Sequence, residues 1–116
     1  MTKEQQVDEQ MVLSYFENRS VLDHYEEATR RVGLWASEEL VFKHSFPSYS
    51  TKLLELGCGV GRISFSLWMM GYQNLTATDV SKKMIKRANA IQRERKSAIQ
   101  FNQEDATNLT FSAGLF

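Results

Sequence analysis

The sequence has little cysteine, no excess of charge and no long apolar run, and each shortage excludes a class of protein. One cysteine in 116 residues allows neither an internal disulfide nor a zinc site built from thiols. The 14 basic and 14 acidic side chains give a formal net charge of +0, which argues against a dedicated nucleic-acid-binding protein. No apolar run is long enough for a membrane span or a signal segment, so we expect a cytoplasmic protein with no membrane contact.

Proline is also scarce, and the single Pro47 separates two different sequence patterns. Before it, residues 3–46 show apolar side chains at three- and four-residue intervals, which predicts helices. Tyr15 and Tyr25 fit the apolar faces of the first two helices, and we expect them in the core. Ser37 is the expected N-cap of a third helix, which should end before Pro47. Residues 1–50 therefore form a predicted N-terminal helical region.

After residue 50 the pattern becomes an alternation of short apolar runs and helices. The run Lys52–Leu56 suits a strand buried on both faces, and two further strands are predicted at 75–79 and 99–103. Helices are predicted between them, at 63–70 and after the N-cap Ser81. This order predicts an α/β fold of Rossmann type over residues 51–116, with a parallel sheet and right-handed crossovers.

The end of this region carries apolar residues up to Phe116 and no polar tail. Three parallel strands in this order would leave one edge of the first strand unpaired, which is an association hazard. We therefore expect the sequence to be the front part of a longer domain. Pairing of two copies through the exposed edge, giving a homodimer, is a further expectation.

A glycine-rich turn follows the first predicted strand, with glycines at positions 57, 59 and 61. Glycine reaches backbone conformations closed to other residues and lets a ligand approach the main chain, here beside the start of a helix. A dinucleotide-binding turn has the pattern G-x-G-x-x-G, whose third glycine would fall at Arg62. A Walker loop is excluded because no Lys-Ser or Lys-Thr pair follows. The plainer alternative is a tight strand–helix turn with no ligand.

Acidic residues stand at the ends of the other two predicted strands. Asp79 ends the second strand, where a carboxylate can accept hydrogen bonds from both hydroxyls of a ribose. Asp105 and Ala106 follow the third strand, where an acid can accept from an adenine amino group and a small residue leaves room for the ring. The alternatives are a helix-capping acid at Asp79 and a solvated loop acid at Asp105.

Together these three elements resemble the class I S-adenosylmethionine-dependent methyltransferases. The matching segments are residues 53–62, 76–84 and 101–111, so the resemblance covers about residues 50–111. It implies a sheet of about seven strands, of which this chain supplies the first three. It also implies that the N-terminal helices form the variable lid region that precedes the first strand in such enzymes.

The resemblance also implies roles for individual residues. The turn glycines, with Cys58 between them, would wrap the methionine and ribose parts of S-adenosylmethionine. Glu55 would lie beneath the amino group of the cofactor, and Asp79 would bind the ribose hydroxyls. Val80 and Met84 would flank the adenine, and Asp105 and Ala106 would meet its edge.

No residue is identified as catalytic, and no metal ligand is expected. Trp35 and Tyr25 are candidate residues of the lid or substrate pocket, although packing of Trp35 against the sheet is the plainer interpretation. His24 and His44 lie on separate predicted helices without a matching acid motif, so they are no better than generic candidates for a general base. Cys58 has no neighbouring base that would activate it.

The predicted function is methyl transfer from S-adenosylmethionine to a small-molecule acceptor, with this chain as the cofactor-binding part. Two alternatives of other classes stay open. One is a fragment of an NAD-dependent oxidoreductase, against which the position of Arg62 and the Asp105–Ala106 pair count. The other is a non-catalytic binding or assembly module.

Overall fold

The computed structural model describes residues 9–31 and 35–116, which form five helices and three strands. In chain order these are α1 (Glu9–Glu17), α2 (Arg19–Arg31), α3 (Ala36–Ser45), β1 (Leu53–Leu56), α4 (Arg62–Met70), β2 (Leu75–Asp79), α5 (Lys82–Arg95) and β3 (Gln100–Gln103). Among the described residues, no helix combines the length and apolarity that crossing a membrane requires.

The three strands form one parallel sheet in the order β1-β2-β3. Leu53 pairs with Leu75 at the start of the sheet, and Asp79 pairs with Gln103 at its end. The predicted α/β fold and the β-α-β-α-β order are therefore confirmed. Because the strands run in the same direction, their carboxyl ends meet at one edge, where the glycine turn and the strand-end acids lie.

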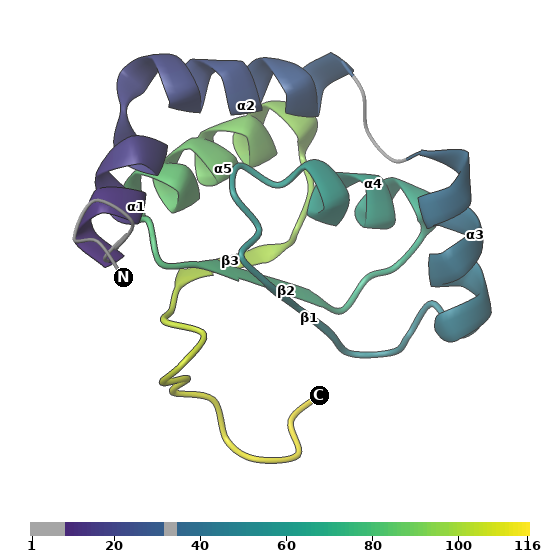
Figure 1. Ribbon diagram of the computed structural model, residues 1–116. Coiled ribbons are helices and arrows are strands. Elements are labelled where there is room, and N and C mark those ends of the chain that lie inside the picture. Colours follow the sequence, from purple (N-terminus) through teal and green to yellow (C-terminus); the bar gives the residue numbers. More distant parts are fainter. Residues whose placement is uncertain (1–8, 32–34) are drawn as a thin grey trace, which may run out of the picture.

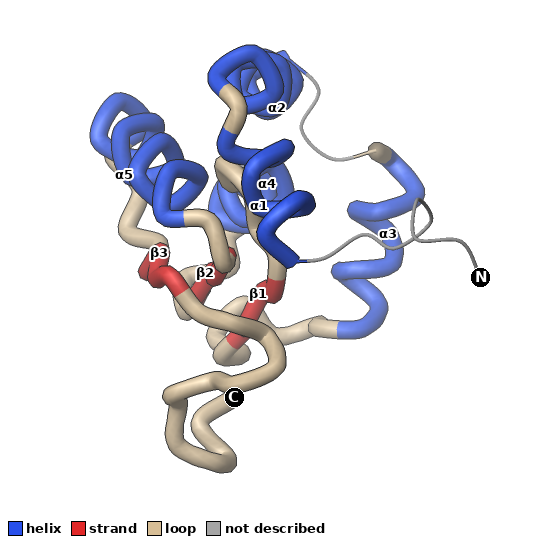
Figure 2. The backbone as a smooth tube through the Cα atoms, turned by 60° about the vertical axis from the view of Figure 1, so that its left-hand side comes forward, coloured by secondary structure: helices blue, strands red, loops and turns tan. Residues whose placement is uncertain are grey.

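Helices α4 and α5 cover one face of the sheet, with α2 lying beyond them (Figures 1 and 2). The segment after β3 turns below the opposite face and carries no helix (Figure 2). This one-sided layering sets which faces of the strands are buried. The carboxyl ends of the strands therefore have the helical layer on one side and the segment after β3 on the other.

The core lies between the sheet and helices α4 and α5. The side of α5 that the sequence predicts as buried is confirmed, and its four residues are Met84, Ile85, Ala88 and Ile91. Phe65 of α4 packs against Phe101 of β3, with ring centroids 5.4 Å apart. Helix α2 adds Leu22 to this core, which is one of the contacts that join the N-terminal region to the sheet domain.

Strand β1 differs from its prediction. The sequence suggested burial on both faces, but its residues are only partly buried and Leu56 is 48% exposed. Within the described residues β1 pairs with β2 alone, so it is an edge strand, and helices cover only one of its faces. The expected unpaired edge is thus confirmed for this part of the chain, whereas the expected two-sided burial is wrong.

Two predictions in the N-terminal helices are also wrong. The N-cap of α3 is Trp35 rather than Ser37, and the Trp35 N–H donates to the Glu38 carboxylate at 3.0 Å. Glu38 thereby supplies the acceptor for a backbone group at the cap. Tyr15 is 60% exposed and lies outside the core, because only a narrow face of α1–α2 reaches the sheet domain. The side chain of Tyr25 lies outside the described residues.

Helix α3 is attached to α4 at both ends. Near the C-terminal end of α4, the buried Tyr72 hydroxyl lies against the carbonyl oxygens of Phe42 and Phe46, which it can bond as donor. At the N-terminal end, Arg62 forms an ion pair with Glu38. Two attachments on opposite ends fix the orientation of α3 as well as its position.

Helices α1 and α2 are held differently, by ion pairs to α5 and by the buried Leu22. Arg87 pairs with Asp23 and also with Glu26, the latter at 3.2 Å, and Lys83 lies 4.0 Å from Glu17. Ion pairs that stay partly open to solvent contribute little to stability and weaken in salt. The attachment of α1–α2 therefore depends on the burial of Leu22 more than on these charges.

Gly61 is the most closely packed glycine of the turn, so we expect Gly61→Ala to destabilise the fold strongly. Gly61 has φ of +100°, and a Cβ there would lie 2.7 Å from the Phe65 ring. We expect a loss of about 2 to 5 kcal/mol in the free energy of unfolding, measured by urea denaturation, because backbone strain and overpacking add.

The matched control is Gly114→Ala, where φ is also positive at +78° but a Cβ would meet nothing within 4 Å. It should lose only about 1 to 2 kcal/mol, the cost of the backbone conformation alone. Equal losses at the two positions would contradict the packing argument.

Candidate functional site

The glycine turn between β1 and α4 forms an open cradle. Gly57 and Gly59 have φ of +71° and +57°, and a Cβ built on either would meet no atom within 4 Å. The main chain at these two positions is therefore accessible to a ligand. Gly61 is different, since it is buried against Phe65 and Phe101, and its missing side chain serves the packing of α4 on β3.

Asp79, at the end of β2, fixes this turn. Its Oδ2 accepts from the Gly59 N–H at 2.9 Å, and its Oδ1 accepts from the Ser81 N–H at 2.9 Å. Ser81 is the N-cap of α5, as predicted, and accepts from the Met84 N–H at 3.2 Å. A carboxylate has lone pairs for more than two hydrogen bonds, so Asp79 keeps capacity to accept from a ligand.

Glu55 points from β1 toward the helical layer and lies close to the turn. Its carboxylate accepts from the buried Ser64 hydroxyl of α4. Burial raises the pKa of Glu55 above its usual range; the Ser64 hydrogen bond and the nearby Arg62 charge act in the opposite direction, while Asp79 adds to the rise. A partly desolvated acid of this kind gains from a cationic partner.

Cys58 is buried inside the turn, where its N–H donates to the Thr78 carbonyl at 2.8 Å and extends the pairing of β1 with β2. Burial, with the nearby Glu55 and Asp79 charges, raises the pKa of the Cys58 thiol far above its usual range. The thiol is therefore un-ionised at neutral pH and is a poor nucleophile. Its place in the site is that of a small residue within the turn.

The two residues predicted to flank an adenine ring have different surroundings. Val80 is 50% exposed beside the end of β2, with its carbonyl accepting from the Gln103 amide at 3.2 Å. Met84 is only 2% exposed and belongs to the core. The structure therefore leaves Val80 accessible to a ligand and places Met84 beneath the surface.

The third acidic element is brought next to the second by sheet pairing. The N–H of Glu104 donates to the Asp79 carbonyl at 3.0 Å, which places Asp105 and Ala106 at the same edge of the sheet. Both residues are exposed. Asp105 Oδ1 accepts from the Thr107 hydroxyl and N–H at 2.7 and 2.9 Å, and these bonds lower the pKa of Asp105. Asp105 is thus ionised and held in one orientation at neutral pH.

Sequence reasoning assigned no functional role to Glu38 or Arg62, although the two form an ion pair directly after the last turn glycine. The Arg62 guanidinium donates to both Glu38 carboxylate oxygens, at 3.1 and 3.3 Å. Two features of the sequence could have indicated this pair. Arg62 directly follows the last turn glycine, and Glu38 occupies the third position after a helix cap, where acids turn back toward the cap.

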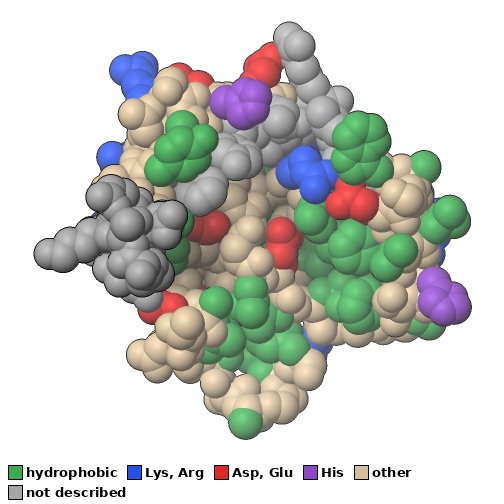
Figure 3. All heavy atoms as spheres, in the orientation of Figure 1, with side chains coloured by type: hydrophobic (Ala, Val, Ile, Leu, Met, Phe, Trp, Pro, Cys, Tyr) green, Lys and Arg blue, Asp and Glu red, His purple; other side chains and the backbone are tan. Residues whose placement is uncertain are grey.

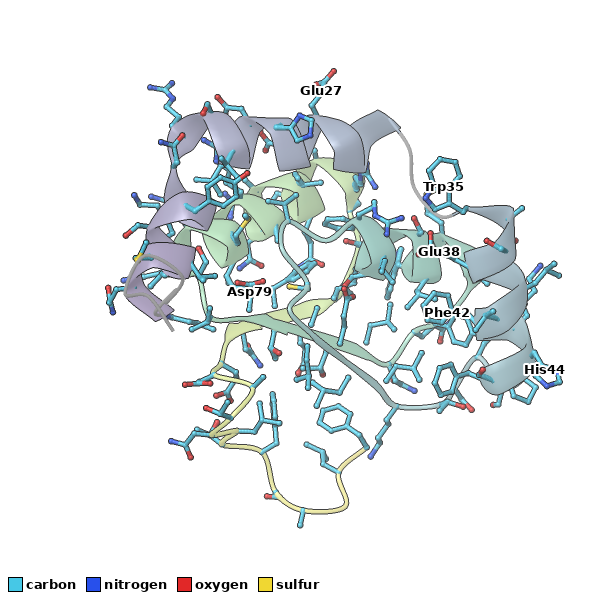
Figure 4. All side chains as sticks on the ribbon, in the orientation of Figure 1. Glu27, Trp35, Glu38, Phe42, His44 and Asp79 are labelled. Atoms are coloured by element: carbon cyan, nitrogen blue, oxygen red, sulfur yellow. The ribbon has the colours of Figure 1, made fainter. Side chains whose placement is uncertain are left out.

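Trp35 is 64% exposed and does not pack on the sheet. Figure 4 shows it at the start of α3, well separated from Asp79, so the structure does not bring the two together. Figure 3 shows acidic side chains within a recess of this face and a paired acidic and basic side chain at its edge. An open glycine turn among acids suits a ligand with cationic groups and hydroxyls.

Comparison with known proteins shows which family carries this arrangement of strands and turn. A family model described as a methyltransferase domain matches residues 53–116, from β1 to the last residue. The chain belongs to the methyltransferase-domain family. This confirms the resemblance to S-adenosylmethionine-dependent methyltransferases and counts against the alternative of an oxidoreductase fragment.

Relatives and solved structures of this family agree with the match. The eEF1A lysine and N-terminal methyltransferase of Danio rerio is 34% identical over 73 residues, which are 63% of this chain and 11% of that protein. Its Drosophila melanogaster homologue is 28% identical over 68 residues, which are 59% of this chain and 10% of that protein. This methyltransferase-family chain therefore spans about a tenth of the length of the curated relatives it matches.

Among solved structures, magnesium protoporphyrin IX methyltransferase from Synechocystis, with bound SAH, superposes with a TM-score of 0.66. The match has 21% identity and covers 88% of this chain and 53% of the other, so it supports the fold. A protein from Pyrococcus horikoshii gives a TM-score of 0.57 at 28% identity, covering 83% of this chain and 40% of the other. The methyltransferase fold assignment thus rests on most of the chain.

The raised pKa of Glu55 predicts a pH-dependent stability effect of Glu55→Gln. Folding favours the protonated form of a buried acid, so wild-type stability falls as pH rises from the ordinary glutamate value of about 4.3 through the raised pKa. The substituted amide stays neutral and can still accept from Ser64. In urea denaturation, the free energy of unfolding of the variant should therefore increase relative to that of wild type as pH rises. A stability difference that stays constant between about pH 4 and about pH 8 would contradict this.

Proposed function

We propose that this chain carries the cofactor-binding part of an S-adenosylmethionine-dependent methyltransferase. The observation that carries the proposal is the open cradle at Gly57 and Gly59, braced by Asp79. A side chain at either glycine would fill the cradle, and the acid beside it suits a ribose. A neighbour in the fold comparison has bound SAH, the demethylated form of this cofactor, which supports the choice.

Each proposed contact follows from the position of a described residue. The main chain at Gly57 and Gly59 receives the methionine part, Glu55 faces its ammonium group, and Asp79 accepts from the ribose hydroxyls. Val80 offers an apolar surface to the adenine, whose edge meets Asp105 and Ala106. Gly61, Cys58 and Met84 shape the turn and the layer beneath it rather than contacting the cofactor directly.

In the proposed reaction, this part of the protein positions the cofactor and supplies no acid or base. When bound, S-adenosylmethionine would supply a methyl group already activated on a sulfonium centre. The residues of the turn hold the cofactor in one orientation, and the helical layer limits water at the site. We propose that residues 1–50 form the lid of this site and residues 51–116 its cofactor-binding domain, in a cytoplasmic protein.

The methyl acceptor has two candidates. The sequence predicts a small molecule, and that remains our first candidate. A protein acceptor is the second candidate, favoured by relatives whose names state methylation of eEF1A. Incubation with radiolabelled S-adenosylmethionine and purified eEF1A separates them, because only a protein acceptor carries label through precipitation with acid.

The cofactor assignment predicts that the purified chain binds SAH and that Asp79→Asn weakens this binding. Asparagine keeps the shape of the side chain but has one acceptor oxygen in place of two, while Gly59, Ser81 and the ribose all need acceptors. We expect SAH affinity in isothermal titration calorimetry to fall by about tenfold or more.

Two controls make this test specific. Asp23→Asn makes the same chemical change at an exposed position on α2 and should leave the SAH affinity within about twofold of wild type. NAD should give no binding heat. Binding of NAD in place of SAH, or equal losses in both variants, would overturn the assignment.

A further inference from the structure

Arg62 lies between two carboxylates that belong to different parts of the fold. It forms two parallel hydrogen bonds to Glu38 of α3, at 3.1 and 3.3 Å. Its charge also acts on Glu55 of β1, where it counters the rise in the pKa of that acid. The guanidinium thus has a partner on the N-terminal helices and stands at the start of α4, the helix whose Ser64 hydroxyl donates to Glu55.

Glu38 is well placed to hold the guanidinium. Its carboxylate also accepts from the Trp35 N–H at 3.0 Å, and α3 is attached at its other end through Tyr72. The Arg62 hydrogen bonds and the Trp35 N–H lower the pKa of Glu38, so it is ionised at neutral pH. Glu38 is therefore a fixed, charged acceptor with the geometry that a guanidinium prefers.

Glu55 has different partners. One of its oxygens accepts from the Ser64 hydroxyl, and its pKa is raised first by burial and further by the nearby Asp79. In the proposed function Glu55 faces the ammonium group of the cofactor. An arginine and an ammonium group that approach the same carboxylate compete for it, because each neutralises the charge that attracts the other.

We propose that Glu38 is a positioning residue that holds the Arg62 guanidinium away from Glu55, so that the Glu55 carboxylate stays available to the cofactor. This inference rests on the proposed function and adds a role for the N-terminal helices. Helix α3 controls the charge of the cofactor site through Arg62, and it does so without touching the cofactor.

A simpler role for the same ion pair makes different predictions. If the pair were only a strut that attaches α3 to α4, breaking it from either side would have the same effect. Under the positioning role, the two sides differ. Glu38→Gln releases Arg62 toward Glu55 and weakens cofactor binding, whereas Arg62→Met removes the competitor.

A double-mutant cycle read by SAH titration separates the two roles. Glu38→Gln should weaken SAH binding by roughly tenfold, a coupling in the usual range for linked sites. Arg62→Met should not weaken it, and the double variant should return to within about twofold of wild type. Glu39→Gln, the same change at a neighbour that pairs with Lys43, should have no effect. Equal weakening in both single variants and the double variant would overturn the proposal.

A measurement without ligand distinguishes failure of this inference from failure of the proposed function. The pKa of Glu55, followed by carboxyl NMR shifts in the protein alone, should fall in Glu38→Gln because Arg62 then pairs with Glu55. It should not fall in the double variant. An unchanged pKa of Glu55 in Glu38→Gln would overturn the inference, even if wild type binds SAH. A lowered pKa without any SAH binding by wild type would overturn the proposed function instead.

Discussion

The site depends on the Asp79 carboxylate, which bonds the glycine turn on one side and the start of α5 on the other. Parallel pairing places the carboxyl ends of β1, β2 and β3 at one edge of the sheet. Strand pairing alone does not fix the backbone conformation of the glycine turn. The Gly59 N–H donates to Asp79 and thereby fixes that conformation. The same acid is the proposed ribose ligand, so under the proposed function the residue that shapes the site would also bind the cofactor.

Burial of Glu55 has a cost for stability that its proposed function would offset. A carboxylate beneath the helical layer loses hydration, and its pKa rises as a result. A neutral residue would serve the fold equally well or better, since it could keep the contact with Ser64. Retaining an acid at this position makes physical sense when a cationic ligand restores the lost stabilisation on binding.

Most of the sheet domain could be predicted from the sequence, because the spacing of apolar residues and the placement of glycines are local signals. The turn at Gly57–Gly61 and the cap at Ser81 each depend on a few neighbouring residues, and both predictions are confirmed. The partial exposure of β1 could not be predicted, since it depends on which faces distant helices cover. The exposure of Tyr15 has the same origin: periodicity indicates an apolar face but not how much of it finds a partner.

The pair Glu38–Arg62 was missed for a related reason. Each residue has an ordinary local role, one in the first turn of a helix and one after a glycine turn, and only the tertiary fold brings them together. By contrast, the proximity of Asp79 and Asp105 could be predicted because both stand at the ends of strands that pair in one sheet. Sequence patterns therefore predict which residues the sheet brings together, but they do not predict contacts between α3 and α4.

If the carboxyl edge of the sheet is the cofactor site, addition of SAH should shift the amide NMR signals of that edge. The signals of Gly57, Gly59 and the residues around Asp79 should move together in a saturable way. Signals from the C-terminal half of α5, which lies away from that edge, should stay in place (Figure 1). Shifts confined to α1, α2 or the segment after β3, with the turn unaffected, would show that SAH does not bind at the glycine turn.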